Sequence, residues 1–381
     1  AAAILDGKST GNSYFNLSVY PTSVPVSIAL TENGSTRKLL EAGAVIKPSF
    51  CGPCFGAGDV PANNGFSLRH TTRNFPNREG SKPGEGQLAG VALMDSRSIA
   101  ATAANGGVVT AATDIEYDFK EMPYTFDQTV YKNRVYNGYG NPQSDEKLIL
   151  GPNITDWPKM YELGENLLLE LAAVIHDPVT TTDELIPSGE TSSYRSNPLR
   201  LAEFTLSRRV PDYVPRAKKI AALEAERRAD SSPEALRAVL AHFGDADALM
   251  KTTQFGSCVF ANKPGDGSAR EQAASCQKVL GGFANICYEF ATKRYRSNCI
   301  NWGMLPFTLD ADTPFDHQPG DCVFVPDVRK LVGQGSEDFP AMVLRADGSK
   351  TPLVLHVRGL TDDEREILLD GCLMNYYAKR G

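Results

Sequence analysis

Between about residue 116 and residue 165 the sequence loses the regular spacing of hydrophobic side chains, and tyrosine, proline, asparagine and glycine dominate it. The run from Tyr136 to Pro142 is the clearest example. Such a composition is typical of a connecting segment, and its length favours a connection that travels over a surface rather than a tight turn. Because 381 residues exceed what one hydrophobic core usually organises, the sequence predicts two compact units joined by this linker.

The overall composition is that of an ordinary globular protein, with 41% hydrophobic and 22% charged residues. No window approaches the roughly 20 uninterrupted apolar residues of a membrane span. The first residues also lack the basic-then-apolar order of a secretory signal. These features predict a cytoplasmic protein without a membrane partner. A formal net charge of −7 argues against a nucleic-acid partner held by bulk attraction, because that mode needs a basic surface.

The region before the linker, residues 1 to about 115, alternates between strand-like and helix-like patterns. Val24–Leu30 has the β-branched bias of a strand, Thr36–Gly43 looks helical, and Val45–Phe50 looks like a second strand. Ser96–Gly106 is predicted to be an alanine-rich helix that ends at a pair of glycines. The pattern indicates an α/β unit.

The region after the linker, from about residue 166 to residue 381, is predicted to be the second unit. Leu167–Ile175 is strongly apolar and favours a strand. Pro215–His242 is a charged helical stretch that is interrupted before Pro233, where Ser232 would cap a second helix. The basic residues of this stretch are interpreted as a solvated helix face: Lys218, Lys219, Arg227 and Arg228.

The eight cysteines fall into two groups. Cys51 and Cys54 are separated by two residues and flanked by glycines, so both thiols can bind one metal centre from a single turn. Alone, this pair could also be a redox pair or half of a zinc site. The other cysteines are scattered through apolar or mixed sequence and are expected to be reduced and structural: Cys258, Cys276, Cys287, Cys299, Cys322 and Cys372.

Two arginines, Arg73 and Arg78, lie five residues apart in a segment rich in turn residues. This spacing does not place them on one helix face, but a loop can aim both side chains at one point. Because a guanidinium holds a carboxylate through two hydrogen bonds, converging arginines suit a di- or tricarboxylate substrate. Two ordinary surface arginines are the alternative interpretation.

Ser268 lies between glycine-rich sequence and a predicted helix, in the run Gly265–Arg270. Its hydroxyl would be exposed at a helix N-terminus, where free backbone N–H groups favour negative charge. An ordinary helix-capping serine is the alternative. A fourth segment, Thr180–Gly189 followed by Arg195, is by itself only a polar loop with an arginine nearby.

Taken together and in this order, the four segments resemble the aconitase superfamily, which includes homoaconitase and isopropylmalate isomerase. In that family a Cys-Gly-Pro-Cys turn supplies two of the three cysteine ligands of a [4Fe–4S] cluster, and Cys51 and Cys54 match it. Arg73 and Arg78 match two substrate-binding arginines of the loop that follows.

The resemblance continues in the second half of the chain. Arg195 matches a substrate-binding arginine that follows the family's Thr-Thr-Asp-His-Ile segment. In the family's Gly-x-Gly-Ser-Ser-Arg-Glu loop the first serine is the catalytic base and the arginine binds substrate, and these positions correspond to Ser268 and Arg270. The sequence departs from the family pattern at four motif positions: Thr72, Asn77, Glu184 and Ala269.

The resemblance implies an α/β fold in two parts. Residues 1–115 would be the end of a three-layer α/β/α aconitase domain 3, residues 116–165 the linker, and residues 166–381 a swivelling β/β/α domain like the isopropylmalate isomerase small subunit. The implied activity is that of a hydro-lyase, the reversible dehydration of a hydroxy di- or tricarboxylic acid. The departures point to a hydratase branch of the superfamily rather than to aconitase proper.

The family's first cluster cysteine and its first two domains would precede residue 1. The resemblance therefore implies a piece of a longer protein whose N-terminal domains are its partners. Alone, this piece is expected to be inactive, with two of three cluster ligands and no complete cluster. Two alternatives stay open: a cluster-free RNA-binding regulator, and a catalytically inactive structural relative.

Overall fold

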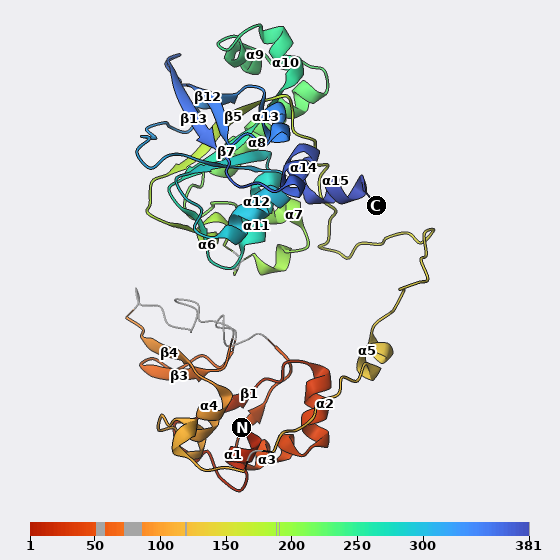
Figure 1. Ribbon diagram of the computed structural model, residues 1–381, viewed down its shortest axis with the longest axis vertical. Coiled ribbons are helices and arrows are strands. Elements are labelled where there is room, and N and C mark those ends of the chain that lie inside the picture. The colour runs from red at the N-terminus through yellow and green to blue at the C-terminus, as the bar shows by residue number, and fades with distance from the viewer. Residues whose placement is uncertain (51–57, 72–85, 119, 188, 190, 381) are drawn as a thin grey trace. The chain divides into compact units, whose positions relative to one another are not determined.

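The computed structural model describes residues 1–50, 58–71, 86–118, 120–187, 189 and 191–380. The chain divides into two compact units, Ala1–Glu146 and Lys147–Gly381 (Figure 1). The division falls inside the predicted linker. Both units combine helices with strands, as expected for the α/β class. Four candidate site residues lie outside the described residues: Cys51, Cys54, Arg73 and Arg78.

The first unit combines short helices with pairs of parallel strands. Its elements in chain order are α1 (Ala2–Leu5), β1 (Ser18–Val19), α2 (Val24–Glu32), α3 (Ser35–Glu41), β2 (Val45–Ile46), β3 (Gly65–Arg69), β4 (Ala89–Leu93), α4 (Ser96–Ala104), the 3-10 helix η3 (Ala112–Asp114) and α5 (Thr129–Arg134). Strand β1 pairs with β2, and β3 with β4. Leu5, Leu39 and Ala103 lie in a small core between α1, α3 and α4.

The prediction of a strand at Val24–Leu30 is wrong, because these residues lie in α2. Ser23 starts the helix: its hydroxyl accepts a hydrogen bond from the Val26 N–H at 3.4 Å. Pro25 lies in the first turn, where a helix does not need its missing N–H. These start signals outweigh the weak strand preference of the β-branched residues.

The other predicted elements of this unit are confirmed in position, with one shortened. Helix α3 corresponds to Thr36–Gly43 and α4 to Ser96–Gly106. The glycines that follow α4 have φ of 63° and 93°, the left-handed region in which helices commonly end. Strand β2 contains only two of the residues predicted at Val45–Phe50.

The second unit is built on a closed barrel. Its strands are β5 (Asn166–Ile175), β7 (Thr253–Ala261), β9 (Gly282–Cys287), β10 (Leu305–Thr308), β11 (Cys322–Val325), β12 (Asp338–Leu344) and β13 (Lys350–His356). Strands β5, β7, β9 and β10 are parallel to their neighbours in that order. The pairs β10–β13, β13–β12, β12–β11 and β11–β5 are antiparallel and complete the ring.

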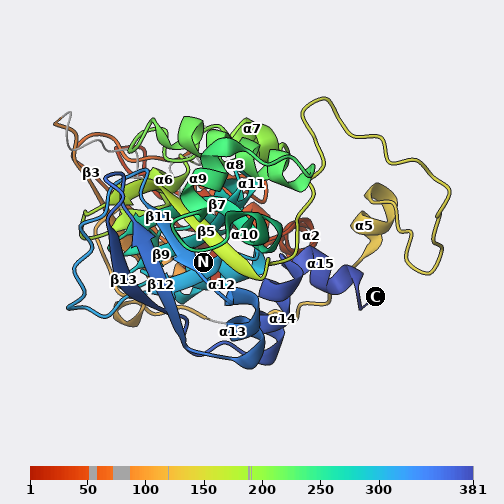
Figure 2. The ribbon, with the colours of Figure 1, turned by 90° about the horizontal axis from the view of Figure 1, so that it is seen from above.

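Helices cover the barrel on opposite sides (Figure 2). They are α6 (Thr182–Leu185), α7 (Pro198–Ala202), α8 (Tyr213–Arg228), α9 (Glu234–Leu240), α10 (Ala246–Thr252), α11 (Arg270–Val279), α12 (Lys293–Asn301), α13 (Val328–Gln334), α14 (Asp362–Asp370) and α15 (Leu373–Ala378). The predicted strand at Leu167–Ile175 is confirmed as β5. This run is apolar at every position except Glu170, because Leu168 packs in the core with α8 and α11, while Leu167 and Leu169 pack in the core with α13 and α14.

Two details predicted for the helical stretch after residue 215 are wrong. Helix α9 begins at Glu234 and its N-cap is Pro233, so Ser232 does not cap it. Arg227 and Arg228 are not on a solvated face, because the Nε atoms of both lie 2.7 Å from the Glu224 carboxylate, whose side chain is only 9% exposed. That carboxylate also accepts a hydrogen bond from the backbone N–H of Phe255 at 3.0 Å. Helix α8 therefore turns its last basic residues toward the barrel, whereas Lys218 and Lys219 are exposed.

The cysteines of the second unit are free and buried, as predicted: Cys258, Cys276, Cys287, Cys299, Cys322 and Cys372. Among the residues that the structure describes, no helix has the length and apolarity needed to cross a membrane.

Candidate functional site

Two of the segments singled out in the sequence lie side by side. The short strand β6 (Thr180–Thr181) runs parallel to β8 (Pro264–Asp266), with Thr180 opposite Pro264 and Thr181 opposite Asp266. These segments follow the carboxyl ends of the neighbouring parallel strands β5 and β7. Ligands of α/β sheets bind outside that end of the strands. The barrel thus brings together two motifs that are distant in sequence.

The backbone of the loop before Ser268 depends on glycine at two positions. Gly265 has φ of 96°, and a Cβ atom there would lie 2.3 Å from the Tyr295 ring. Gly267 has φ of 126°, and its Cβ would lie 2.3 Å from the hydroxyl oxygen of Thr182. Both the conformation and the close packing exclude a larger residue. The loop is therefore held tightly against α12, which carries Tyr295, and against α6, which begins at Thr182.

The Tyr295 side chain is held in place by its own contacts, so it cannot move away from this loop. The side chain is completely buried. Its hydroxyl donates a hydrogen bond to Asn285 Oδ1 at 2.7 Å and accepts one from Gln277 Nε2 at 2.9 Å. Asn285 Nδ2 in turn donates to Gln277 Oε1 at 2.8 Å, which closes a ring of three buried polar side chains.

Ser268 is exposed and lies directly before the N-terminus of α11. The N-cap residue is Ala269, and it makes no side-chain hydrogen bond to the helix. The alternative interpretation of Ser268 as the ordinary capping residue is therefore wrong. The first N–H groups of α11 receive no capping side chain from Ala269, and they carry the positive end of the helix dipole next to Ser268.

Arg270 and Arg195 are carried by different elements of the second unit. Arg270 is the first residue of α11 and is partly buried. Arg195 is exposed and ends the 3-10 helix η4 (Ser192–Tyr194). The chain continues from Arg195 into α7, which packs against α11. Of the seven predicted site residues, the structure thus describes Ser268, Arg195 and Arg270, all carried by packed elements of the second unit.

Glu184, where the family has histidine, has a structural role that the sequence analysis missed. Its carboxylate accepts hydrogen bonds from the Thr181 backbone N–H at 2.7 Å and from the Thr181 hydroxyl at 2.9 Å. The Thr181 hydroxyl accepts one from the Glu184 N–H at 3.2 Å, which completes a capping box at the start of α6. The Thr-x-x-Glu spacing in the sequence is the signal from which this capping box could have been predicted. The carboxylate is engaged in starting a helix rather than in holding a ligand.

The described residues do not supply a metal centre. Among them no group of three or more histidine, cysteine, aspartate or glutamate side chains is placed to hold a metal ion. Burial raises the pKa of Cys299 and that of Cys322 to about 12, and it also raises the pKa values of Cys258, Cys276 and Cys287. These buried thiols are therefore protonated at neutral pH, as expected for structural cysteines. The assignment of cluster ligands to Cys51 and Cys54 stays a prediction.

Comparison with known families agrees with the order of the motifs. The family model of the aconitase family (aconitate hydratase) matches residues 1–101, and that of the aconitase C-terminal domain matches residues 221–312. The chain belongs to the aconitase superfamily. The resemblance inferred from the sequence motifs is thereby confirmed.

Several curated relatives are hydro-lyases of this superfamily. The mitochondrial homoaconitase of Cryptococcus neoformans is 26% identical over 71% of this chain and 33% of its own length. A 3-isopropylmalate dehydratase large subunit of Pyrococcus furiosus is 43% identical over 21% of each chain, and the aconitate hydratase A of Bradyrhizobium diazoefficiens is 32% identical over 35% of this chain and 15% of its own. The chain thus spans a third or less of the length of these aconitase relatives.

A solved structure of 3-isopropylmalate dehydratase from Methanocaldococcus jannaschii is also similar. It is 21% identical, with a TM-score of 0.33, over 56% of this chain and 95% of its own.

Proposed function

We propose that this chain carries part of the active site of an aconitase-like hydro-lyase that reversibly dehydrates a hydroxy di- or tricarboxylic acid. The observation that carries the proposal is the position of Ser268, exposed on a glycine-fixed loop at the N-terminus of α11 and two residues before Arg270. Membership in the aconitase superfamily supports the reaction class. The relatives' names include homoaconitase, isopropylmalate dehydratase and aconitate hydratase.

The proposed base is the Ser268 hydroxyl. Dehydration of a hydroxy acid requires the removal of a weakly acidic C–H proton, and a serine hydroxyl ionises too weakly to do this unaided. The N-terminus of α11 places partial positive charge next to Ser268, and the Arg270 guanidinium, two residues further along, would add to it. In a site closed to water, such charges stabilise an alkoxide at Ser268.

Arginines are the proposed carboxylate-binding groups. Arg195 and Arg270 would each hold a carboxylate through charge-assisted hydrogen bonds, together with Arg73 and Arg78 from the first unit. Cys51 and Cys54 would supply two ligands of a [4Fe–4S] cluster, which when bound acts as a Lewis acid on the leaving hydroxyl.

The proposal also assigns a domain of the aconitase fold to each part of the chain. Residues 1–115 would be the end of aconitase domain 3, residues 116–165 the linker, and residues 166–381 the swivelling domain. In this proposal the enzyme is cytoplasmic, further N-terminal domains complete the site, and this chain alone is inactive. The length of the relatives, of which the chain spans a third or less, supports the further domains.

The test is turnover in the complete protein that contains this chain, after reconstitution with iron and sulfide and a screen of hydroxy-acid substrates. Ser268→Ala is expected to lower turnover by about a hundredfold or more, the range of losses for a general base. Ser232→Ala is the matched control, because Ser232 is also exposed shortly before a helix but caps nothing. An unchanged rate in Ser268→Ala would remove this serine from the mechanism.

A further inference from the structure

Residues 151–163, which we call the strap, form the end of the connection between the units and lie against the second unit. At the start of the strap, Asn153 Nδ2 donates a hydrogen bond to the Ser193 carbonyl. The Thr155 backbone N–H donates to the Ser196 carbonyl at 3.1 Å. The Thr155 hydroxyl donates to Asn197 Oδ1 at 3.1 Å, and Asn197 Nδ2 donates to Asn153 Oδ1 at 3.3 Å. These contacts fix the backbone on both sides of Arg195.

The middle of the strap reaches the segment of the other described arginine. Trp157 packs on Trp302, with ring centroids 4.4 Å apart. Trp302 Nε1 donates a hydrogen bond to Glu271 Oε1 at 2.9 Å. Glu271 directly follows Arg270 in the first turn of α11. A single stretch of the strap therefore contacts the backbone around Arg195 and, through one tryptophan, the helix turn that carries Arg270.

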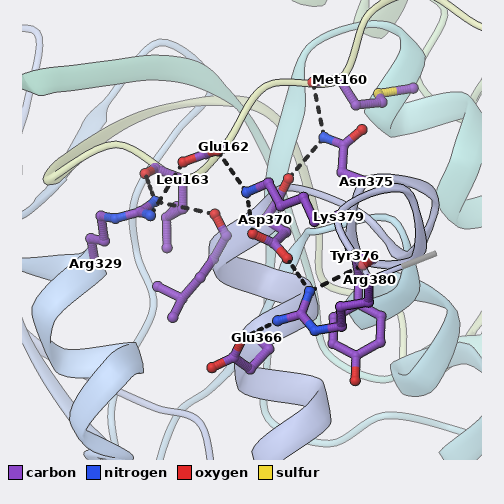
Figure 3. Close-up of polar contacts among 11 residues, drawn as sticks. Met160, Glu162, Leu163, Arg329, Glu366, Asp370, Asn375, Tyr376, Lys379 and Arg380 are labelled. Carbon is purple, nitrogen blue, oxygen red and sulfur yellow. Dashed lines mark hydrogen bonds and ion pairs between the residues drawn. The ribbon is translucent and has the colours of Figure 1, made fainter.

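The far end of the strap is anchored to the C-terminal helices (Figure 3). Asn375 Nδ2 donates to the Met160 carbonyl at 3.1 Å, and Lys379 Nζ donates to Glu162 Oε1 at 2.7 Å. Arg329 Nη1 donates to the Leu163 carbonyl at 2.6 Å. This end is held by ion pairs and backbone contacts, so it provides a fixed point from which the first half of the strap extends.

We propose that the strap positions Arg195 relative to Arg270, so that both guanidinium groups meet one polycarboxylate ligand. Asn153, Thr155 and Trp157 are then positioning residues. Arg195 is exposed at the end of a 3-10 helix of three residues. The strap forms hydrogen bonds with the residues on either side of Arg195. Holding a binding group in place before the ligand arrives reduces the entropy cost of binding. The inference rests on the proposed function, because it assumes that these arginines bind carboxylates.

The experiment compares Asn153→Leu/Thr155→Val with the unsubstituted 381-residue chain. The double substitution removes the three side-chain hydrogen bonds of the strap to Ser193 and Asn197 while keeping the branching of each side chain. Calorimetric titration with tricarballylate, a tricarboxylate without a hydroxyl group, measures binding. Near-ultraviolet circular dichroism measures docking of the strap, because Trp157 and Trp302 are the two tryptophans of the chain. Far-ultraviolet spectra check that the variants fold.

The double variant is expected to bind tricarballylate about tenfold more weakly, because the hydrogen bond between Arg195 and a ligand carboxylate is weakened. The tryptophan signal is expected to change with it. Ile154→Thr is the matched control, since this exposed residue lies between the two substituted positions, and it should bind as the parent does. Unchanged affinity in the double variant, together with a loss in Arg195→Ala, would overturn the positioning role alone. Absence of binding to the parent chain would overturn the positioning role in this chain, whereas the proposed function is decided separately by the turnover of the complete protein.

Discussion

Gly267 and Thr182 are in direct contact, and the space between them is too small for a side chain. A Cβ atom at Gly267 would lie 2.3 Å from the Thr182 hydroxyl oxygen. The contact joins the loop that carries Ser268 to the start of α6, two segments that are far apart in the sequence. The packing of one glycine therefore decides where the proposed base lies.

Gly267→Ala is expected to destabilise the second unit and to displace the Ser268 loop. The strained backbone and the clash together should lower the free energy of unfolding by about 2–3 kcal/mol. The measurement is urea unfolding. The control is Gly359→Ala, because Gly359 has φ of 68° but a Cβ atom there would meet nothing within 4 Å. It should cost only about 1 kcal/mol for the left-handed backbone. Equal losses in the two variants would contradict the steric argument.

Glu184→Ala is expected to lower the free energy of unfolding by about 1 kcal/mol, the usual effect of losing a helix cap. Glu184→Gln keeps an oxygen that can accept the hydrogen bonds of Thr181, so it should retain most of the stability. Because the Glu184 carboxylate is engaged with Thr181, the Gln variant should also keep the pH dependence of turnover in the complete protein. A shifted pH profile in Glu184→Gln would show instead that this carboxylate takes part in proton transfer.

Lys278 should make stability depend on pH. Its side chain is buried, and Nζ donates to the Gly303 carbonyl at 3.2 Å and lies 4.5 Å from the Phe283 ring centroid. Burial lowers the pKa of Lys278 from 10.5 to about 7. Between these values the unfolded lysine binds a proton that the folded lysine has lost. The contribution of Lys278 to stability therefore rises as the pH increases from 7 toward 10.5.

The pH effect is measured with Lys278→Met. At about pH 6.5 the variant should be the more stable protein, because it does not bury a charge. Its advantage should shrink by about 1.4 kcal/mol for each pH unit above about 7. The buried thiols shift the stability of both proteins alike, so the difference between them isolates the lysine. Lys251→Met, at an exposed lysine of α10, is the control. A difference that stays constant from about pH 6.5 to about pH 9 would contradict the prediction.

Removal of the predicted cluster ligands should abolish iron–sulfur binding in the complete protein. Cys51→Ser and Cys54→Ser should each prevent the appearance of the visible absorption band on reconstitution with iron and sulfide, because a serine replaces the thiolate ligand. Cys258→Ala is the control, since Cys258 is a buried thiol whose pKa is raised by burial. Reconstitution that proceeds equally well in all three variants would exclude a role for the Cys51 and Cys54 pair.

The sequence predicted best those features that depend on short-range patterns. The run Leu167–Ile175 is apolar at almost every position, as a strand buried on both faces must be. The loop before Ser268 could be recognised because its glycines are required by local backbone conformation and packing. The helix at Ser96–Ala104 has a cap residue and a glycine stop, both visible in the sequence.

Features that depend on distant contacts could not be predicted. The sequence alone indicates that Arg227 and Arg228 are solvated. It does not show that their partner Glu224 lies against the barrel, where its carboxylate accepts a hydrogen bond from the Phe255 backbone N–H. The strap looks like a featureless connection because its partners, such as Trp302, lie far away in the sequence. The placement of Cys51, Cys54, Arg73 and Arg78 stays a prediction.

The order of strands in the barrel also has a consequence for synthesis. Strand β5 is made early, yet Leu169 pairs with Val323 in β11, and the ring closes only when Thr308 meets His356. Until β11 has emerged from the ribosome, the backbone edge of the apolar strand β5 that pairs with β11 has no partner. Such an edge invites pairing with other chains. The nascent protein is therefore expected to need protection by chaperones until its last strand emerges.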